Sequence, residues 1–361
     1  MKKKVLYLGW VGFGNLGDDV CRDIFVEQTN ALSATKELNI EVNSKYAGTF
    51  SNEDLLAYKP DLVVLGGGSL LTYRNAKRLL FAQKNGIPTI IWGSGKDGMN
   101  DDIWTGEAHH RLPKSAKLIL KAVEKSVLVG LRGPHTSQFL KACGYKSSST
   151  QICGDPGLLL TSSIKSTPIK SKAIKSIIDK KNIIGINLGT THNRLYGGNE
   201  QYISEEMVNV TNKLTENYTV VLFSMWHKDI PAIKKLANQI SNKKNLIVLD
   251  SVYPIAQLSN ILEQCTFTVN FKLHANVFSA AVGTPFISLG YRAKCNDFAT
   301  SLGLENFVVR TDTTNFGASV LEKSDVLMND RITYLKTMNS AKRKYEMRLS
   351  SLTEKIINLI D

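Results

Sequence analysis

The sequence lacks a long apolar run and has only five cysteines, and both features limit the class of protein to which it can belong. No stretch reaches the roughly 18 apolar residues that a membrane-spanning helix needs. After a basic start the apolar run soon ends in glycine and aspartate, so we read residues 5–10 as a strand and not as part of a signal peptide. The cysteines form no Cys-x-x-Cys pair and no metal-binding spacing with histidine. We therefore expect a cytoplasmic protein with reduced thiols and no metal.

The chain has a formal charge of +13 but lacks a nucleic-acid-binding signature, and its lysines are scattered. We therefore expect no nucleic-acid partner. Two basic segments, 164–181 and 341–348, would attract an anionic membrane surface or an acidic substrate. Peripheral contact with the inner membrane face is thus one interpretation, and an ordinary lysine-rich surface explains either segment equally well.

Apolar runs alternate with helical patterns at the spacing of β–α units. The first half contains predicted strands at 5–10, 62–65, 89–92 and 127–131. The second half contains them at 183–188, 219–224, 246–249, 266–270, 286–289 and 307–309. A segment rich in lysine and serine, 161–182, is the predicted linker, and residues 326–360 have the pattern of one long amphipathic helix or two consecutive ones.

This pattern predicts an α/β protein with two Rossmann-like domains, since 361 residues are too many for one ordinary core. The domains would cover residues 1–165 and 183–325, and a C-terminal helical segment, 326–361, would pack back. We expect the two domains to face each other across a cleft, as in GT-B enzymes.

The most informative motif lies in the second half. Lys272 and His274 follow the strand that ends at residue 270, and Tyr291 and Lys294 follow the next strand. Because the carboxyl ends of parallel strands line one edge of a sheet, these side chains should converge beside a helix N-terminus, which favours anions. The motif predicts a pocket for a multiply charged anion with a histidine for proton transfer. The alternative is a buried helix start with solvated lysines.

The first predicted strand is followed by a glycine-rich loop, Gly12–Asp19. Its glycines suit a phosphate cradle, but Asp18 and Asp19 put negative charge where a pyrophosphate would lie. A carboxylate there would serve as a base toward a hydroxyl. An ordinary helix cap by Asp18 is equally consistent with the sequence, with the helix beginning near Val20.

Other strand ends carry further candidates. A glycine run follows strand 62–65 and would let a ligand approach the backbone, although a tight turn is the alternative; it comprises Gly66, Gly67, Gly68 and Ser69. Arg132 follows strand 127–131, and its guanidinium suits a carboxylate or phosphate. His227 and Asp229 form a candidate acid or orienting pair after strand 219–224, or an ordinary surface pair. We take the remaining histidines as structural or exposed: His109, His110, His135 and His192.

In this order the motifs resemble the polysaccharide pyruvyl transferase family over roughly residues 5–300. The first-half matches are the Gly12–Asp18 loop with Asn15, then Gly66–Gly68, Arg132 and Gly154–Pro156. The second-half matches are His227–Asp229, Lys272–His274, Gly283–Pro285 and Tyr291–Lys294. The chain departs from the family in two places. Lys272 stands where the family usually has arginine, and the segment at His227 is one residue shorter.

The resemblance implies an enzyme that moves the enolpyruvyl group of phosphoenolpyruvate onto hydroxyls of a cell-surface glycan or its lipid-linked precursor, forming a pyruvate ketal without a cofactor. It implies that His274 is the acid and that Asp18 or Asp19 is the base on the acceptor side. The donor would be held by Arg132, Lys272 and Lys294, with His227, Tyr291, Asn15 and the glycine run as further contacts.

Two other functions stay open. One is a GT-B glycosyltransferase that uses a nucleotide sugar, although no carboxylate near residues 274–297 suits a ribose. The other is a non-catalytic glycan-binding relative, to which the lysine at position 272 is the sole pointer.

Overall fold

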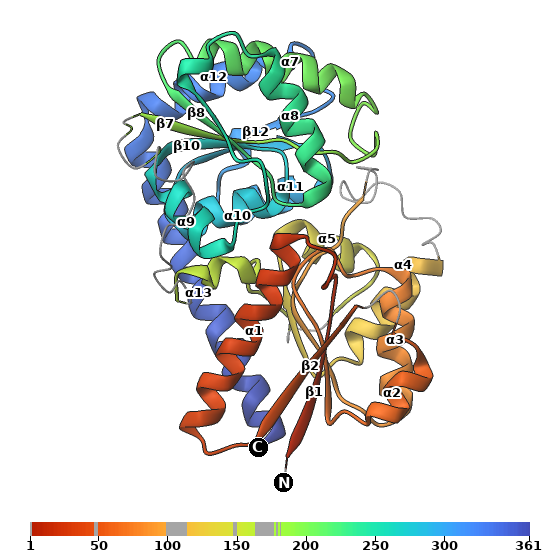
Figure 1. The fold of residues 1–361 in the computed structure, drawn as a ribbon. Coiled ribbons are helices and arrows are strands. Elements are labelled where there is room, and N and C mark those ends of the chain that lie inside the picture. Colours follow the sequence, from red (N-terminus) through yellow and green to blue (C-terminus); the bar gives the residue numbers. More distant parts are fainter. Residues whose placement is uncertain are drawn as a thin grey trace. The chain divides into compact units, whose positions relative to one another are not determined.

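The computed structural model describes residues 2–46, 50–98, 114–146, 150–162, 177, 180 and 182–361. The chain divides into two compact units, one of residues 1–159 with 343–361 and one of residues 160–342 (Figure 1). Each unit is built on a six-stranded parallel sheet. Most of the predicted linker, most of the basic segment 164–181, and His109 and His110 lie outside the described residues.

The first unit alternates strands and helices along the chain, and its sheet has the order β2-β1-β3-β4-β5-β6. The strands are β1 (Lys3–Gly9), β2 (Ile40–Tyr46), β3 (Leu62–Leu65), β4 (Thr89–Ser94), β5 (Leu128–Leu131) and β6 (Thr150–Ile152). The helices are α1 (Leu16–Thr35), α2 (Asn52–Tyr58), α3 (Tyr73–Lys84), α4 (Lys114–Glu124) and α5 (Pro134–Ala142), and a 3-10 helix, η2 (Pro156–Ser162), follows β6.

Apolar strands buried between helices form the core of this unit. β3 and β4 are buried along their whole length, as expected for the middle of a parallel sheet. In Figure 1, α1 and the C-terminal helix lie on one side of the sheet and α2, α3 and α4 on the other. Short polar caps start several helices: Thr72 accepts the backbone N–H of Asn75 at α3, and Ser51 forms a capping box with Asp54 at α2.

The second unit repeats the arrangement with the sheet order β12-β11-β10-β7-β8-β9. Its strands are β7 (Ile183–Asn187), β8 (Thr219–Phe223), β9 (Leu246–Val248), β10 (Cys265–Asn270), β11 (Phe286–Gly290) and β12 (Val308–Arg310). Its helices are α7 (Glu200–Leu214), α8 (Ile230–Gln239), α9 (Ile255–Gln264), α10 (Leu273–Ala281), α11 (Ala293–Ser301) and α12 (Phe316–Asn329), and three 3-10 turns are η3 (His227–Asp229), η4 (Lys243–Asn245) and η5 (Glu305–Phe307).

Each sheet has one topological switch point, a pair of neighbouring strands from which later strands are added toward opposite edges of the sheet. In the first unit the switch point lies between β1 and β3, and in the second it lies between β7 and β10. Ligands of open parallel sheets bind beyond the carboxyl ends of the strands at such points. The loops after these four strands are therefore where a site is expected.

All ten predicted strands are present, with ends that differ by at most two residues. Two strands escaped prediction: β2 and β6, which are the two edges of the first sheet. β2 contains several polar residues and is half-buried except at the exposed Lys45, and β6 has only three residues. Neither carries the continuous apolar run that marks a central strand.

The C-terminal pattern corresponds to two helices, and the break falls at Asp330. α12 begins at Phe316, ten residues before the predicted start at 326, and α13 (Arg331–Ile360) follows. Residues 331–342 of α13 count with the second unit and the remainder with the first. Within the first unit, the Thr353 hydroxyl accepts from the indole N–H of Trp92 (3.1 Å) and donates to Gln28 (2.9 Å), which fixes α13 beside α1.

All five cysteines are free and buried, in agreement with the predicted reduced thiols. Among the described residues, no helix is both long and apolar enough to cross a membrane.

We predict that Tyr334→Phe lowers the free energy of unfolding by about 2 kcal/mol, because two buried backbone groups lose their partner. The Tyr334 hydroxyl donates to the carbonyl oxygen of Phe286 (2.6 Å) and accepts from the N–H of Phe286 (3.0 Å), which docks α13 on β11. Denaturant titration measures the change, with Tyr73→Phe on the exposed start of α3 as the control. An equal effect of the two variants would contradict this role.

Candidate functional site

The switch point of the second unit is built around Lys272, which stands directly before α10. Asn187 ends β7 and is fully buried. Its amide oxygen accepts from the backbone N–H of Lys272 (2.9 Å), and its amide nitrogen donates to the carbonyl oxygen of Phe223 at the end of β8 (2.9 Å). One side chain thus ties three neighbouring strand ends together and fixes the start of α10.

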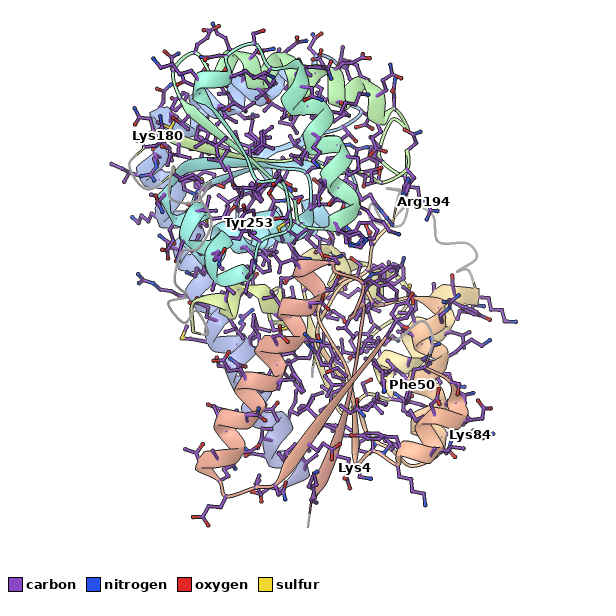
Figure 2. The ribbon with its side chains drawn as sticks, viewed as in Figure 1. Lys4, Phe50, Lys84, Lys180, Arg194 and Tyr253 are labelled. Carbon is purple, nitrogen blue, oxygen red and sulfur yellow. The ribbon has the colours of Figure 1, made fainter. Side chains whose placement is uncertain are left out.

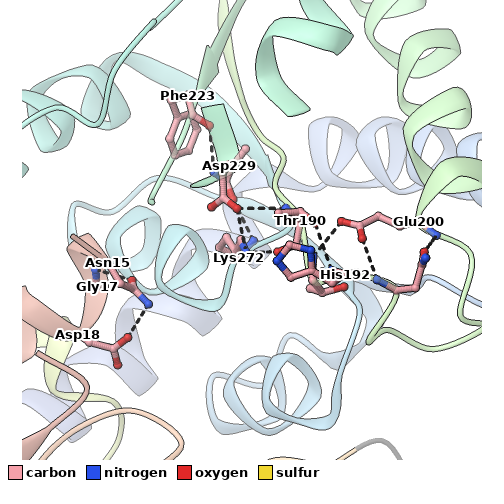
Figure 3. Close-up of polar contacts among 12 residues, drawn as sticks. Asn15, Gly17, Asp18, Thr190, His192, Glu200, Phe223, Asp229 and Lys272 are labelled. Carbon is pink, nitrogen blue, oxygen red and sulfur yellow. Dashed lines mark hydrogen bonds and ion pairs between the residues drawn. The ribbon is translucent and has the colours of Figure 1, made fainter. Parts of the chain in front are cut away.

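The ammonium group of Lys272 lies in a polar cage formed by the loop after β7 and by η3 (Figure 3). It is 3.0 Å from Asp229 Oδ1 and donates to the carbonyl oxygen of Thr190 (2.7 Å). Asp229 is fully buried and also accepts from the backbone N–H of Thr190 (3.1 Å). An ammonium has three donors, and two of those of Lys272 are used here.

Burial pushes both members of this pair toward their neutral forms. It lowers the pKa of Lys272 and raises that of Asp229, while the attraction between the two opposes both shifts. The positive charge of Lys294 lowers the pKa of Lys272 further, so the two lysines are near neighbours. We treat the pair as ionised, because Asp229 also accepts a backbone N–H, which stabilises the carboxylate.

A second carboxylate fixes the loop after β7. Glu200, the first residue of α7, accepts from the backbone N–H of Thr191 (2.8 Å) and of Asn193 (3.0 Å). The Asn193 side chain accepts from the N–H of Glu200 in return (3.0 Å) (Figure 3). Asn193 has a positive φ of 59°, a conformation that asparagine adopts more readily than most residues. The loop that supplies Thr190 to the lysine is therefore held at two points.

Aromatic rings connect the two lysines. The Lys272 ammonium lies 5.6 Å from the ring centre of Trp226 and 5.8 Å from that of Phe271. Phe271 stacks on Tyr291 (4.5 Å between ring centres), and the Lys294 ammonium lies 5.0 Å from the Tyr291 ring. These side chains follow β8, β10 and β11, so the structure brings Lys272, Tyr291 and Lys294 together at one sheet edge.

The two predicted site histidines of this unit differ in their surroundings. His274 lies in the first turn of α10, is almost fully buried and stacks on Phe278 (6.0 Å). His227 is exposed and meets Trp226 edge to face (5.7 Å). The predicted pairing of His227 with Asp229 is wrong, because the carboxylate turns to Lys272 and Thr190 instead.

In the first unit, hydrogen bonds from its own side chains hold the loop after β1 in place. Asn15 caps α1: its side-chain oxygen accepts from the N–H of Gly17 (3.2 Å), and its amide nitrogen donates to Asp18 (2.6 Å). Asp19 accepts from the N–H of Gly12 (2.9 Å). The helix therefore begins at Leu16, and neither aspartate caps it, which corrects the sequence-based expectation. Asp18 is left at the helix start as a half-buried carboxylate.

The glycine run after β3 lies against this loop. Gly68 has a φ of 99°, and a Cβ at its position would be 2.7 Å from Asp18 Oδ1. Beneath the run, the N–H of Gly67 donates to the hydroxyl of Tyr7 (3.2 Å), and Gly66 lies directly on the Tyr7 ring. Burial raises the pKa of Tyr7, with neighbouring Cys21 and acidic groups adding to the effect. A neutral phenol thus supports the buried backbone surface of the glycine run next to Asp18.

Cys21 and Asp155 form a buried pair below that surface. Asp155 accepts from the N–H of Gly157 (3.0 Å), and the Cys21 thiol contacts the same carboxylate oxygen (3.8 Å). Burial, and then the charge of Asp155, raise the pKa of Cys21. The thiolate is the reactive form of cysteine, so burial disfavours a nucleophilic role for Cys21.

Arg132 is completely buried at the end of β5. Its guanidinium donates to the hydroxyl of Ser69 (3.1 Å) and to the carbonyl oxygen of Lys96 (3.2 Å), and it packs flat on Gly95. It therefore positions the loops after β3 and β4. Contact of Arg132 with a ligand stays a prediction.

The two edges thus offer different chemistry. The second unit brings two cations near the N-terminus of α10, whose first turn also contains His274, and this arrangement suits an anion. The first unit presents a half-buried carboxylate, Asp18, at the start of α1, which suits a hydroxyl. Sequence reasoning missed the supporting residues, namely Tyr7, Asn187, Thr190, Trp226, Glu200 and the lysine-binding role of Asp229.

Comparison with known proteins identifies the chain's relatives. A family model described as polysaccharide pyruvyl transferase matches residues 15–292. No curated protein matches the sequence. Among solved structures, Staphylococcus aureus MnaA with UDP has a TM-score of 0.67 at 16% identity and covers 100% of this chain and 96% of its own. A putative UDP-N-acetylglucosamine 2-epimerase from Listeria monocytogenes has a TM-score of 0.65 at 10% identity, covering 97% and 94%.

These similarities show the fold alone at such identities. Two Rossmann-like α/β units of the GT-B type are confirmed. The predicted cleft between them stays a prediction.

We predict that Asp229→Asn lowers the pKa of Lys272 below its already depressed value, because the carboxylate is the main group that opposes the effect of burial. An NMR titration of protein labelled at the lysine Cε carbons would follow Lys272 directly. The control is Asp325→Asn, which removes an exposed carboxylate from α12. An unchanged or higher midpoint in Asp229→Asn would show that the two groups are not an ion pair.

Proposed function

Because the chain belongs to the polysaccharide pyruvyl transferase family, we propose that it transfers the enolpyruvyl group of phosphoenolpyruvate to two hydroxyls of a glycan and forms a pyruvate ketal. The acceptor is a cell-surface polysaccharide or its lipid-linked precursor. The observation that supports this best is the paired Lys272 and Lys294 beside the N-terminus of α10, with His274 in its first turn.

Phosphoenolpyruvate carries a phosphate and a carboxylate, so its site needs more than one positive group. In this proposal Lys272 and Lys294 bind the two anionic groups, and the N-terminus of α10 adds backbone N–H donors. Tyr291, His227 and Asn15 are further contacts. Arg132 acts through Ser69, whose hydroxyl it already holds.

The proposed reaction begins with proton transfer. His274 donates a proton to C3 of the donor, which makes C2 electrophilic, and a first acceptor hydroxyl forms a bond to C2. The C2–O bond to phosphate then breaks, and the second hydroxyl closes the ketal. Two O–H bonds, one C–O bond and the C2–C3 π bond are broken, while one C–H bond, two C–O bonds and one O–H bond on phosphate form. One hydroxyl proton replaces that of His274, and the other leaves with phosphate.

Asp18 is the proposed base for the acceptor. Its carboxylate lies against Gly68, whose lack of a side chain makes room for it: a Cβ there would be 2.7 Å from Asp18 Oδ1. Asn15 donates to one of its oxygens, which orients the group. Asp19 is already engaged with the N–H of Gly12, so it serves the loop instead.

The function is tested by incubating the protein with phosphoenolpyruvate and a panel of oligosaccharides and lipid-linked saccharides. Release of phosphate, together with a product heavier by one pyruvate less water, supports the proposal. A UDP-sugar is offered in a parallel reaction, because the structural relatives include proteins solved with UDP. Transfer from the UDP-sugar and none from phosphoenolpyruvate would favour the glycosyltransferase alternative. Glycan binding without any product would favour the non-catalytic one.

We predict that His274→Ala and Lys294→Ala affect different constants. Loss of the proton donor should lower kcat about a hundredfold or more and change the Kd for phosphoenolpyruvate little. Loss of the Lys294 charge should weaken donor binding by about 1.5–3 kcal/mol. Calorimetry gives the affinities, and phosphate release gives the rates. If His274→Ala instead raises the Kd for phosphoenolpyruvate strongly and leaves kcat at saturating donor unchanged, His274 is a binding residue.

We further predict that Asp18→Asn abolishes ketal formation without loss of donor binding or stability, since the amide keeps the contact with Asn15 but is not a base. The matched variant Asp19→Asn should remain active. Asp19→Ala should lower stability by about 1 kcal/mol, because the N–H of Gly12 loses its acceptor. Melting temperature, calorimetry and product analysis separate these effects. Full activity of Asp18→Asn would rule out Asp18 as the base.

A further inference from the structure

The first unit carries a basic hollow that has no part in the proposed reaction. Its volume is about 560 Å³, and it lies between α3 and the start of α2. Four cations line it, Arg74, Lys77, Arg78 and Lys84, together with the apolar side chains of Phe50 and Phe81. Figure 2 shows Phe50 and Lys84 on the side of the unit where these helices lie. No carboxylate is among the described residues that line it.

Arg78 is fixed at the wall of this hollow. Its Nε donates to the carbonyl oxygen of Phe50 (2.8 Å), and its side chain is half-buried. Burial lowers the pKa of Arg78, and the next largest effect in the same direction comes from Arg74. Two guanidinium groups are therefore held near each other, an arrangement that a bound anion stabilises.

The sequence of α3 places charge and apolar surface side by side. Residues 74, 77, 78, 81 and 84 are spaced by three or four, so they share one side of the helix. Ala76, Leu79 and Ala82 are buried and anchor the opposite side in the core. Cations next to partly buried apolar groups are the pattern that binds anionic lipid at a membrane surface, where headgroup and acyl chain meet.

We propose that this hollow binds the phosphate headgroup of an anionic lipid and so holds the protein at a membrane surface. The occupant follows from the four cations without a lining carboxylate and from the partly buried apolar side chains of Leu80 and Phe81, which a free phosphate would leave unused. The proposal does not depend on the proposed transfer, because its test requires no turnover.

The experiment measures co-sedimentation of the full chain with vesicles of phosphatidylcholine alone and with added phosphatidylglycerol. We expect binding only to the anionic vesicles, weakened by salt. In Arg74→Glu/Lys77→Glu it should fall about 25-fold or more, since each basic side chain near such a surface contributes about fivefold. The control Lys234→Glu/Lys235→Glu makes the same charge change on exposed residues of α8.

Three results would overturn the proposal. Equal binding to neutral and anionic vesicles would show that the cations of the hollow do not contribute to vesicle binding. An equal loss in the control pair would show a general effect of net charge. Stabilisation by inorganic phosphate or pyrophosphate, with no vesicle binding, would identify a site for a soluble anion. Arg74 and Lys77 are exposed, so the variant should fold, and a circular dichroism melt verifies this.

Discussion

In a parallel sheet every strand must be followed by a crossover that returns the chain to the same end, so all the loops after strands gather at one edge. At one point in the sheet the strand order reverses, and the loops after the two strands there run to opposite sides of the sheet. They separate and leave space for a ligand. The strand orders put these points between β1 and β3 and between β7 and β10. Asp18 and Gly68 flank the first, and Thr190 and Lys272 flank the second. The position of both candidate sites thus follows from the order of the strands, and the chemistry follows from a few side chains in four loops.

The buried ion pair of Lys272 and Asp229 is better understood as positioning than as stabilisation. Removing two charges from water costs several kcal/mol per ion, and their attraction offsets this only when the geometry is good. Here one oxygen of Asp229, Oδ1, accepts from both the ammonium and the N–H of Thr190, while the buried Oδ2 has no hydrogen-bond partner among the described residues, so the attraction offsets this cost only in part. A lysine presents a compact charge with three donors, whereas the arginine expected from the resemblance would present a planar fork. Two of the three donors of Lys272 bind Asp229 and the carbonyl oxygen of Thr190, so the side chain also holds together the two loops that it joins.

The sequence allowed prediction of the central strands and of the loops that follow them, because buried parallel strands are continuous apolar runs. It did not reveal β2 and β6, whose edge positions need no such run. Lys272, Tyr291 and Lys294 were predictable as neighbours, since each directly follows a strand of the same sheet. The ion pair of Lys272 with Asp229 could not be predicted, because the two residues are 43 positions apart in the sequence. The short spacing between His227 and Asp229 instead suggested a pair between those two residues. The role of Tyr7 could not be predicted for another reason. A tyrosine in an apolar strand has the pattern of a core residue, and only the fold shows that its hydroxyl accepts from the N–H of Gly67.

The charges at the two switch points argue for different ligands at each. An α1 N-terminus in a Rossmann-like unit would attract a pyrophosphate, but here Asp18 and Asp19 occupy its first turn. Repulsion between these carboxylates and a phosphate disfavours a nucleotide in the first unit, whereas a neutral hydroxyl is compatible with them. The α10 N-terminus carries no acidic residue and has Lys272 at its cap. Proteins solved with UDP share this fold. A shared fold does not fix the ligand, because the loops at strand ends carry the recognition. In this chain the start of α1 carries two carboxylates and the start of α10 carries a lysine, so the two switch points differ in the charge that they present.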